Sequence, residues 1–220
     1  EMVKEKGFLP QDAEQRDQSW LDTYGMVQTI MADFPEFLPN TYDQYYLYPD
    51  YKVSHLDPNF TRADEVMAGR EKRVFTECAE VIKEGKLGDK FHAISDAHAE
   101  MMIKVAEAIA YNKNDRHILI VENNGAIANM QDDAMVEVVC ELGINGPRPM
   151  RVGNIPQFNL GLLVNQVSCE KLIVDAYFEN SYQKALEAFT LNRLINDAKK
   201  ARKVLDALIE ANKGMWPELR

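Results

Sequence analysis

Apolar residues recur at intervals of three and four along most of the chain, which is the period of an amphipathic helix. The pattern predicts a first helix between Pro10 and Pro39, whose apolar face carries Trp20, Tyr24, Val27 and Met31. We expect that face to lie against the core. Seven aromatic rings and three prolines then fall between Phe34 and Tyr51. The prolines interrupt regular structure, and we expect most of these rings to lie in the core as well.

Two longer helices are predicted in the middle of the chain. Thr61, followed three residues later by Asp64, resembles a helix N-cap with an acidic third position. Helical spacing continues until Gly85 and Gly88 end this helix. A second amphipathic run extends over residues 95–111.

The pattern then becomes that of strands. The run 117–121 is short, apolar and β-branched, which is typical of a buried strand, whereas 135–140 alternates as a half-buried strand does. The polar segment 122–133 between them is predicted to be a loop, and loops at strand ends often carry functional sites. The sequence GPRP at 146–149 indicates a turn.

The rest of the chain is predicted to be helical, in four segments: 158–167, 169–178, 182–189 and 194–211. No internal repeat or clear linker interrupts the pattern. We therefore expect a helix-rich α+β domain with a small mixed or antiparallel sheet.

The net charge and the cysteine count argue against a protein that binds nucleic acid or membranes and against one built on disulfide bonds. The chain has 25 Lys and Arg against 35 Asp and Glu, a formal net charge of −10, which repels nucleic acid and anionic membranes. No segment approaches the roughly 20 apolar residues of a membrane-spanning helix. Three cysteines far apart favour free thiols over a disulfide framework. Because the chain opens on Glu1 without a leader, we expect a cytoplasmic protein whose sequence starts inside a longer one.

Recognisable catalytic motifs do not occur in the sequence. Its four histidines have no partner at metal-ligand spacing: His55, His92, His98 and His117. There is no glycine-rich dinucleotide loop, no Walker loop and no nucleophile elbow. We therefore expect no metal site and no self-contained active site within this chain.

Tyr42 is the candidate with the clearest chemical argument. If Asn40 or Thr41 caps a short helix, the phenol lies in the first turn, where the backbone dipole favours negative charge. An unperturbed tyrosine has a pKa of about 10, so a role as base near neutral pH also requires a nearby cation or metal. The alternative is a packed ring that only forms hydrogen bonds.

Arginine and asparagine side chains supply the other candidates. Arg62 begins the long helix, where a guanidinium and free backbone N–H groups suit a phosphate dianion, although it can instead pair with Glu65. Arg70 follows on the same helix, on a face that also suits solvent. Asn123 and Asn124 either bind sugar hydroxyls or close their loop through side-chain turns.

Four segments together resemble the C-terminal half of glycoside hydrolase family 4. They are LPNTYDQYYLYPD (38–50), DPNFTRADEVMAGRE (57–71), LIVENNGAIANMQDDAMVEVVC (119–140) and VGNIPQFNLGLLVNQVSCEKLIVDAY (152–177). The similarity runs almost end to end and is greatest to members that act on 6-phospho-α-glucosides. The chain departs from the family at Met130 and Gln131, where Leu-Pro is frequent, and at Val139, where proline often precedes the cysteine.

The resemblance implies a fold similar to the C-terminal domain of lactate and malate dehydrogenases. In family members a Rossmann domain precedes this one. That domain would supply most of the NAD site, the Cys and His that hold a divalent metal, usually Mn2+, and the Asp considered the general acid. Residues 1–220 would then form one C-terminal domain that is inactive alone.

The family mechanism departs from the usual pair of carboxylates. NAD takes a hydride from sugar carbon three, a tyrosine removes the proton on carbon two, the aglycone leaves by elimination, and water and the hydride then add back. The family tyrosine matches Tyr42, and the metal would be the cation that its role requires. The expected contacts with the substrate are Arg62 and Arg70 for its phosphate, and Asn40, Asn123 and Asn124 in the binding loop.

Two alternatives stay open: a 6-phospho-β-glucosidase of the same family, and a helical interaction domain without catalysis. For the enzyme, the expected partners are a phosphorylated disaccharide and further copies of the protein. We expect a homo-oligomer, a dimer or tetramer, because an apolar face would otherwise be exposed.

Overall fold

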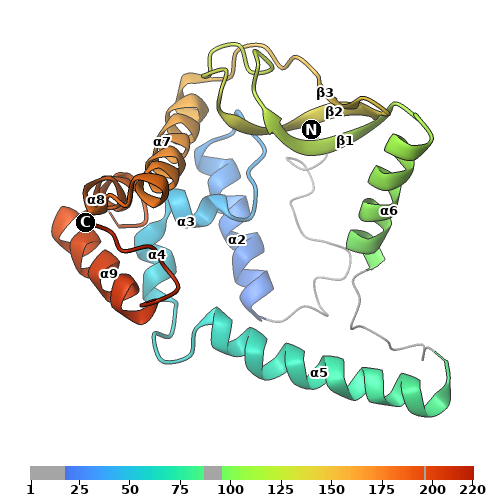
Figure 1. The fold of residues 1–220 in the computed structure, drawn as a ribbon, viewed down its shortest axis with the longest axis horizontal. Coiled ribbons are helices and arrows are strands. Elements are labelled where there is room, and N and C mark those ends of the chain that lie inside the picture. Colours follow the sequence, from blue (N-terminus) through green and yellow to red (C-terminus); the bar gives the residue numbers. More distant parts are fainter. Residues whose placement is uncertain (1–17, 87–95, 196) are drawn as a thin grey trace.

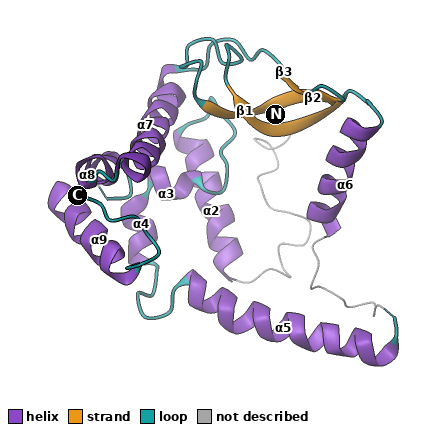
Figure 2. Ribbon diagram, in the orientation of Figure 1, coloured by secondary structure: helices purple, strands orange, loops and turns teal. Residues whose placement is uncertain are grey.

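The computed structural model describes residues 18–86, 96–195 and 197–220 (Figure 1). Its elements are α2 (Gln18–Asp33), α3 (Asp43–Leu47), α4 (Pro49–Ser54), α5 (Arg62–Glu84), α6 (Asp96–Ala110), β1 (Asp115–Glu122), β2 (Met135–Gly143), β3 (Gly146–Pro149), α7 (Gln157–Glu179), α8 (Tyr182–Leu191) and α9 (Ala198–Ala211). Figure 2 shows the strands gathered in one small sheet among the helices. The predicted helix-rich α+β fold is confirmed. The predictions that concern Glu1, Pro10, Gly88 and His92 lie outside the described residues.

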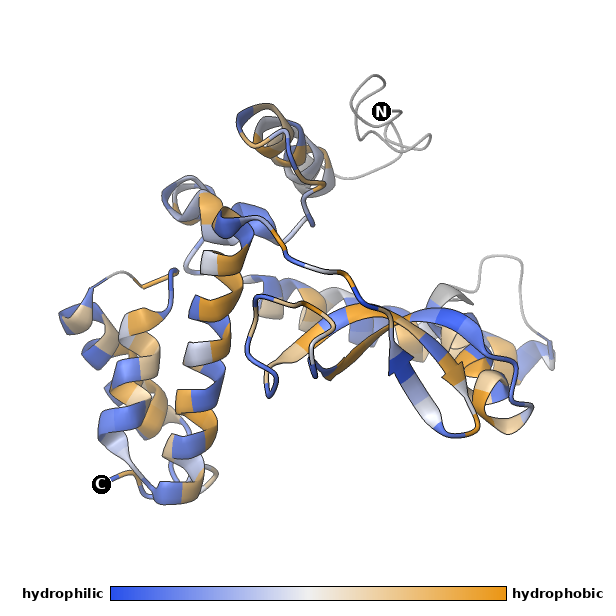
Figure 3. Cartoon of the chain, turned by 90° about the horizontal axis from the view of Figure 1, so that it is seen from above, coloured by the Kyte–Doolittle hydropathy of each residue, from blue (hydrophilic) through white to orange (hydrophobic). Residues whose placement is uncertain are grey.

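The sheet is antiparallel, in the order β1-β2-β3. Its inner face joins the loop after β1 and part of α7 in one core cluster: Val121, Ala126, Ile127, Met130, Ala134, Val136, Val138, Cys140 and Val167. The outer face is open, because Ile118 is 58% and Ile120 is 68% exposed. The prediction of a buried strand over 117–121 is therefore wrong: burial alternates along β1 as it does along β2, since one face alone packs on the core. Figure 3 shows the hydrophobic segments of the sheet.

The segment Gly146–Pro149, predicted to be a turn, is strand β3 instead. It pairs antiparallel with the end of β2, and the reversal itself lies at the facing pair Gly143 and Gly146. The two prolines are tolerated because β3 is an edge strand, where a missing N–H need not break a ladder.

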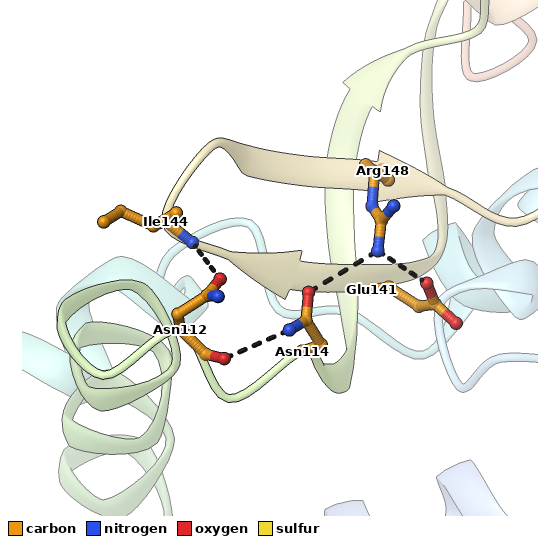
Figure 4. Close-up of polar contacts among 5 residues, drawn as sticks. All are labelled: Asn112, Asn114, Glu141, Ile144 and Arg148. Carbon is orange, nitrogen blue, oxygen red and sulfur yellow. Dashed lines mark hydrogen bonds and ion pairs between the residues drawn. The ribbon is translucent and has the colours of Figure 1, made fainter.

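Asn112 and Asn114 join the end of α6 to the turn between β2 and β3 (Figure 4). The amide oxygen of Asn112 accepts from the Ile144 N–H at 3.0 Å, and Arg148 donates to Glu141 at 3.1 Å and to Asn114 at 3.5 Å. A Cβ at Gly143 would lie 2.7 Å from the Asn112 amide oxygen. Glycine therefore allows this close approach of the turn.

The two helices predicted at 158–167 and 169–178 are one helix, α7. The Ser168 hydroxyl donates to the carbonyl of Val164, one turn earlier, so the serine does not interrupt the helix. Helices α7, α8 and α9 form a second core around Leu205 and the two alanines Ala176 and Ala185. Helix α9 begins later than the predicted residue 194, because Asp197 caps it by accepting from the Lys200 N–H at 2.7 Å.

The prediction that most of the seven rings between Phe34 and Tyr51 are core residues is wrong, because none of the seven is buried. Helix α2 packs through Tyr24, Val27 and Ile30 instead. The rings cover joints between elements, as where Phe34 stacks on Phe158 of α7 with ring centroids 4.9 Å apart.

The predicted ends of α5 are confirmed. Thr61 and Asp64 form a reciprocal capping box, and Gly85 closes the helix in the left-handed conformation, with φ 68°. None of the residues of α5 is buried, and Figure 1 shows the helix lying away from the sheet. Across the described ranges, no helix is long and apolar enough to cross a membrane.

Candidate functional site

Tyr42 lies at the surface, between helix α2 and the five-residue helix α3. It is the N-cap residue of α3, with φ −79° and ψ −16°, and 68% of it is exposed. The prediction placed its ring in the first turn of a helix, and the structure places it one position earlier. Because α3 is so short, its dipole adds little to the stability of a negative charge there.

A set of local hydrogen bonds holds the turn that carries Tyr42. The Asn40 N–H donates to the Asp43 carboxylate at 2.8 Å, and the Tyr42 N–H donates to the side-chain oxygen of Asn40 at 2.9 Å. Burial raises the pKa of Asp43, although its bond from Asn40 acts in the opposite direction. The expectation that Asn40 or Thr41 caps this helix is wrong, because Tyr42 is the N-cap residue. Asn40 instead orders the turn through an Asx-type bond.

One aromatic ring lies beside Tyr42: the centroid of Tyr45 is 6.2 Å from that of Tyr42. Tyr45 in turn lies 5.2 Å from the ammonium of Lys52 on α4. Arg193 donates to the carbonyl of Tyr46 at 3.1 Å and attaches α3 to the segment between α8 and α9. The exposed phenol thus stands on a short helix that is anchored to the C-terminal helices.

Tyr48, at the end of α3, donates its hydroxyl to the carboxylate of Asp33 at the end of α2. This bond to a carboxylate, with some burial, raises the pKa of Tyr48 to about 12. A folded-state pKa above the unfolded value means that the phenol contributes stability fully below about pH 10. That contribution is lost as the pH rises from about 10 to about 12.

We therefore expect Tyr48 to ionise after the ordinary tyrosines of the protein when absorbance at 295 nm is followed against pH. Asp33→Asn removes the carboxylate, so one tyrosine should move to a lower ionisation pH. Tyr48→Phe should remove one late-ionising tyrosine and leave Tyr182, whose bond to Asp206 also raises its pKa, whereas Tyr111→Phe, at an exposed position, should leave both in place. An identical titration curve for the wild type and Asp33→Asn would contradict the assignment.

The predicted phosphate ligands Arg62 and Arg70 lie on α5, which Figure 1 places far from the sheet. The Arg62 guanidinium binds the Glu65 carboxylate at 2.5 Å, which agrees with the alternative that Arg62 pairs with Glu65. The helix N-terminus is already capped, because Thr61 donates to the Asp64 carboxylate at 2.7 Å and 2.8 Å. A phosphate bound at this end would have to compete with two carboxylates.

Asn123 organises the loop between β1 and β2. It is 0% exposed. Its amide nitrogen donates to the carbonyls of Ile127, Met130 and Gln131 at 3.0–3.1 Å, and its oxygen accepts from the Ile127 N–H at 2.7 Å. These bonds favour the loop-closing alternative over the binding of sugar hydroxyls.

Asn124 and Asn129 also hold this loop. Asn124 has a positive φ of 40° and donates to the Glu122 carboxylate at 3.1 Å, with its side chain at the surface. Asn129 joins the loop to the segment before α7 through two bonds with the backbone of Ile155, of 2.9 and 3.0 Å. The loop is therefore a rigid platform beside the start of α7.

Two participants in the Tyr42 region were not singled out from the sequence. Gln44 is the only buried residue of α3 and contacts the backbone next to Tyr42. Asp33 lies 15 residues before its partner Tyr48. No local pattern marks either residue, because each gains its role from a fold-dependent contact.

The described residues contain no group of three or more His, Cys, Asp or Glu side chains able to hold a metal ion. Of the cysteines, Cys140 and Cys169 are buried and burial raises the pKa of both thiols, which disfavours the metal-binding thiolate. The residues that the structure describes therefore do not fit a complete metal site.

These features define an α+β domain that presents one exposed tyrosine on a preformed turn and holds no complete metal centre in its described part. Residues 3–195 match the family model described as "Family 4 glycosyl hydrolase C-terminal domain". The chain therefore belongs to the family 4 glycosyl hydrolases and corresponds to their C-terminal domain.

Several of its relatives are named maltose-6'-phosphate glucosidase or 6-phospho-alpha-glucosidase. The maltose-6'-phosphate glucosidases of Clostridium acetobutylicum (MalH) and Bacillus subtilis are each 48% identical over the whole chain. A crystal structure of a 6-phospho-alpha-glucosidase from gut microorganisms, in complex with NAD and Mn2+, is 82% identical with a TM-score of 0.91 over the whole chain. The chain spans about half the length of these relatives: 50%, 49% and 50%.

Proposed function

We propose that residues 1–220 form the C-terminal domain of an enzyme that hydrolyses 6-phospho-α-glucosides such as maltose 6'-phosphate. The single observation that carries the proposal is the 82% identity over the whole chain to the 6-phospho-alpha-glucosidase from gut microorganisms. The names of the two maltose-6'-phosphate glucosidases favour an α- over a β-glucoside. Within this proposal, a separate Rossmann domain works with the chain, which is inactive alone.

NAD and a divalent metal such as Mn2+ are the proposed cofactors, as in the complex of that relative. Because the described residues lack a metal cluster, we assign the metal and most of the NAD site to the other domain. The contribution of this chain is then to hold the sugar and to accept a proton from it.

Tyr42 is the proposed base. Its phenol is exposed on an ordered turn, where a sugar can reach it, and it matches the tyrosine of the family motif. For the substrate phosphate the proposed ligands are Arg62 and Arg70, both of which lie at the surface of α5. Asn40, Asn123 and Asn124 are the proposed binding-loop residues, and in this role Asn123 acts by fixing the loop.

The proposal is tested with a chimera in which residues 1–220 replace the C-terminal half of the 82% identical relative. Hydrolysis of a chromogenic 6-phospho-α-glucoside is followed with NAD and Mn2+, beside the chain alone and the relative. We expect turnover by the chimera and none by the chain alone. An inert, folded chimera would overturn the proposal in favour of an interaction domain, and preference for a 6-phospho-β-glucoside would correct the substrate.

The protein is also proposed to be a cytoplasmic homo-oligomer. Large apolar side chains are exposed on several elements, among them Phe75 and Ile82 of α5, Ile120 of β1 and Phe178 of α7. Such surfaces favour association. Sedimentation of the chimera should therefore give a mass of a dimer or tetramer, and a monomer at micromolar concentration would count against it.

A further inference from the structure

The direction of the Tyr42 side chain is fixed by very few groups. The phenol is exposed, and its own helix α3 has five residues, too few to be stable without tertiary contacts. No side chain caps α3 at its N-terminus. The backbone around Tyr42 must therefore be held by contacts with the rest of the fold.

The peptide group between Thr41 and Tyr42 is held from both of its ends. At one end the Tyr42 N–H donates to the side-chain oxygen of Asn40 at 2.9 Å. At the other end the Thr41 carbonyl accepts from the side-chain amide of Gln44 at 2.7 Å. Because a peptide group is planar, two bonds at opposite ends fix its orientation. The Tyr42 carbonyl in turn accepts from the Tyr45 N–H at 3.0 Å, which orients the following peptide group, and together these bonds set the direction in which Cβ of Tyr42 leaves the backbone.

The two bonds differ in their surroundings. Asn40 is exposed, so its bond to Tyr42 is accessible to water. Gln44 is 2% exposed and is the buried residue of α3. The Gln44 amide also lies 3.5 Å from the hydroxyl of Thr23 on α2. The partly buried bond from Gln44 thus links the Tyr42 peptide to a buried side chain, and a hydrogen bond shielded from water is electrostatically stronger than one at the surface.

Packing alone would not favour a glutamine at position 44. Its amide oxygen is buried and has no hydrogen-bond partner, which is unfavourable. Exchange of the amide nitrogen and oxygen would bring an oxygen against the Thr41 carbonyl, so the amide orientation follows from that contact. A leucine of similar size would fill the space without an unpaired oxygen. What leucine cannot provide is the bond to the Thr41 carbonyl.

We propose that Gln44 is a positioning residue, which aims the Tyr42 phenol at the substrate by holding the peptide group between Thr41 and Tyr42. The inference rests on the proposed function, in which Tyr42 is the base. A proton acceptor displaced by about 1 Å loses on the order of 100-fold in rate. Gln44 itself touches no substrate, so substrate binding should change little.

The test uses Gln44→Leu in the active chimera, with Thr23→Val as the matched control, because it removes the weaker contact of the amide and keeps the bond to Thr41. For Gln44→Leu we expect kcat to fall by about 10- to 100-fold with KM within about twofold, and a wild-type melting temperature. Thr23→Val should keep the wild-type kcat. In the Tyr42→Phe background, Gln44→Leu should cause no further loss, as residues that act together are not additive.

The outcomes separate this inference from the proposed function. An inert wild-type chimera overturns the proposed function and, with it, the positioning role of Gln44. An active chimera in which Gln44→Leu keeps a kcat within twofold of the wild type overturns the positioning role. If Gln44→Leu does not fold, Gln44→Met, which is unbranched and of similar length, is measured in its place. If both variants unfold, Gln44 serves the fold rather than Tyr42, and the proposal is equally overturned.

Discussion

Tyr42→Phe should abolish turnover of the 6-phospho-α-glucoside by the chimera, lowering kcat by about 100- to 10,000-fold, the range expected for loss of a general base. The substitution removes one hydroxyl from an exposed ring, so the fold and the affinity for NAD should be unchanged. Initial rates with a chromogenic substrate, together with NAD binding followed by fluorescence, measure both quantities.

The control for this prediction is Tyr111→Phe, which removes a similarly exposed hydroxyl at the end of α6. That variant should keep the kcat of the wild type. If Tyr42→Phe kept more than a tenth of the wild-type kcat, Tyr42 would not be the base. A loss of NAD binding together with turnover would instead assign the residue to domain assembly.

The elements that could be predicted from the sequence are those whose ends depend on neighbouring residues. The start of α5 followed from Thr61 and Asp64, and its end from Gly85, because a helix cap is formed by residues that are close together in the sequence. Strand β3 could not be predicted in this way. Its two prolines indicate a turn locally, and only the pairing with β2 and the free outer edge make a strand possible.

Burial was harder to predict than secondary structure. The run 117–121 is apolar at every position but the first, yet Ile118 and Ile120 face outward because the described elements cover one side of the sheet. The rings between Phe34 and Tyr51 are partly exposed because they lie where two elements meet and are covered on one side only. Phe34, which stacks on Phe158 of α7, is an example. Whether an apolar residue is buried depends on the surface opposite it, which a sequence pattern does not contain.

The candidate site shows the same division. Tyr42 could be found because its own segment carries the motif, and the bond between Asn40 and the Tyr42 N–H is local. Gln44 lies in the same segment, but its importance comes from a buried position against α2, 21 residues away at Thr23. A candidate base can be found from a motif in its own segment. Residues that hold it in place require the packed structure.

Asn123→Ala should destabilise the chain more than any other substitution considered, by about 3–5 kcal/mol, as expected when several buried polar groups lose their partners together. Alanine can neither accept a hydrogen bond from the Ile127 N–H nor donate one to the carbonyl of Met130, and both of these bonds to the Asn123 side chain are buried. Urea unfolding of residues 1–220 followed by circular dichroism gives the difference in free energy of unfolding. Asn123→Asp should be no milder, because its carboxylate would face three carbonyl oxygens that now accept from the amide.

The control for the loop is Asn124→Gly, at the exposed neighbouring position. Glycine accepts the positive φ of 40° there, and the substitution removes one surface bond to Glu122, so its cost should stay below about 1 kcal/mol. A similar loss of stability for Asn123→Ala and Asn124→Gly would contradict the role of Asn123 as the buried centre of the loop.

The comparison also separates two roles in catalysis: if Asn123 only fixes the loop, its variants should lose activity in proportion to their unfolded fraction. If Asn124 binds the sugar, Asn124→Gly should raise KM in a chimera that remains fully folded, because the loop itself is intact.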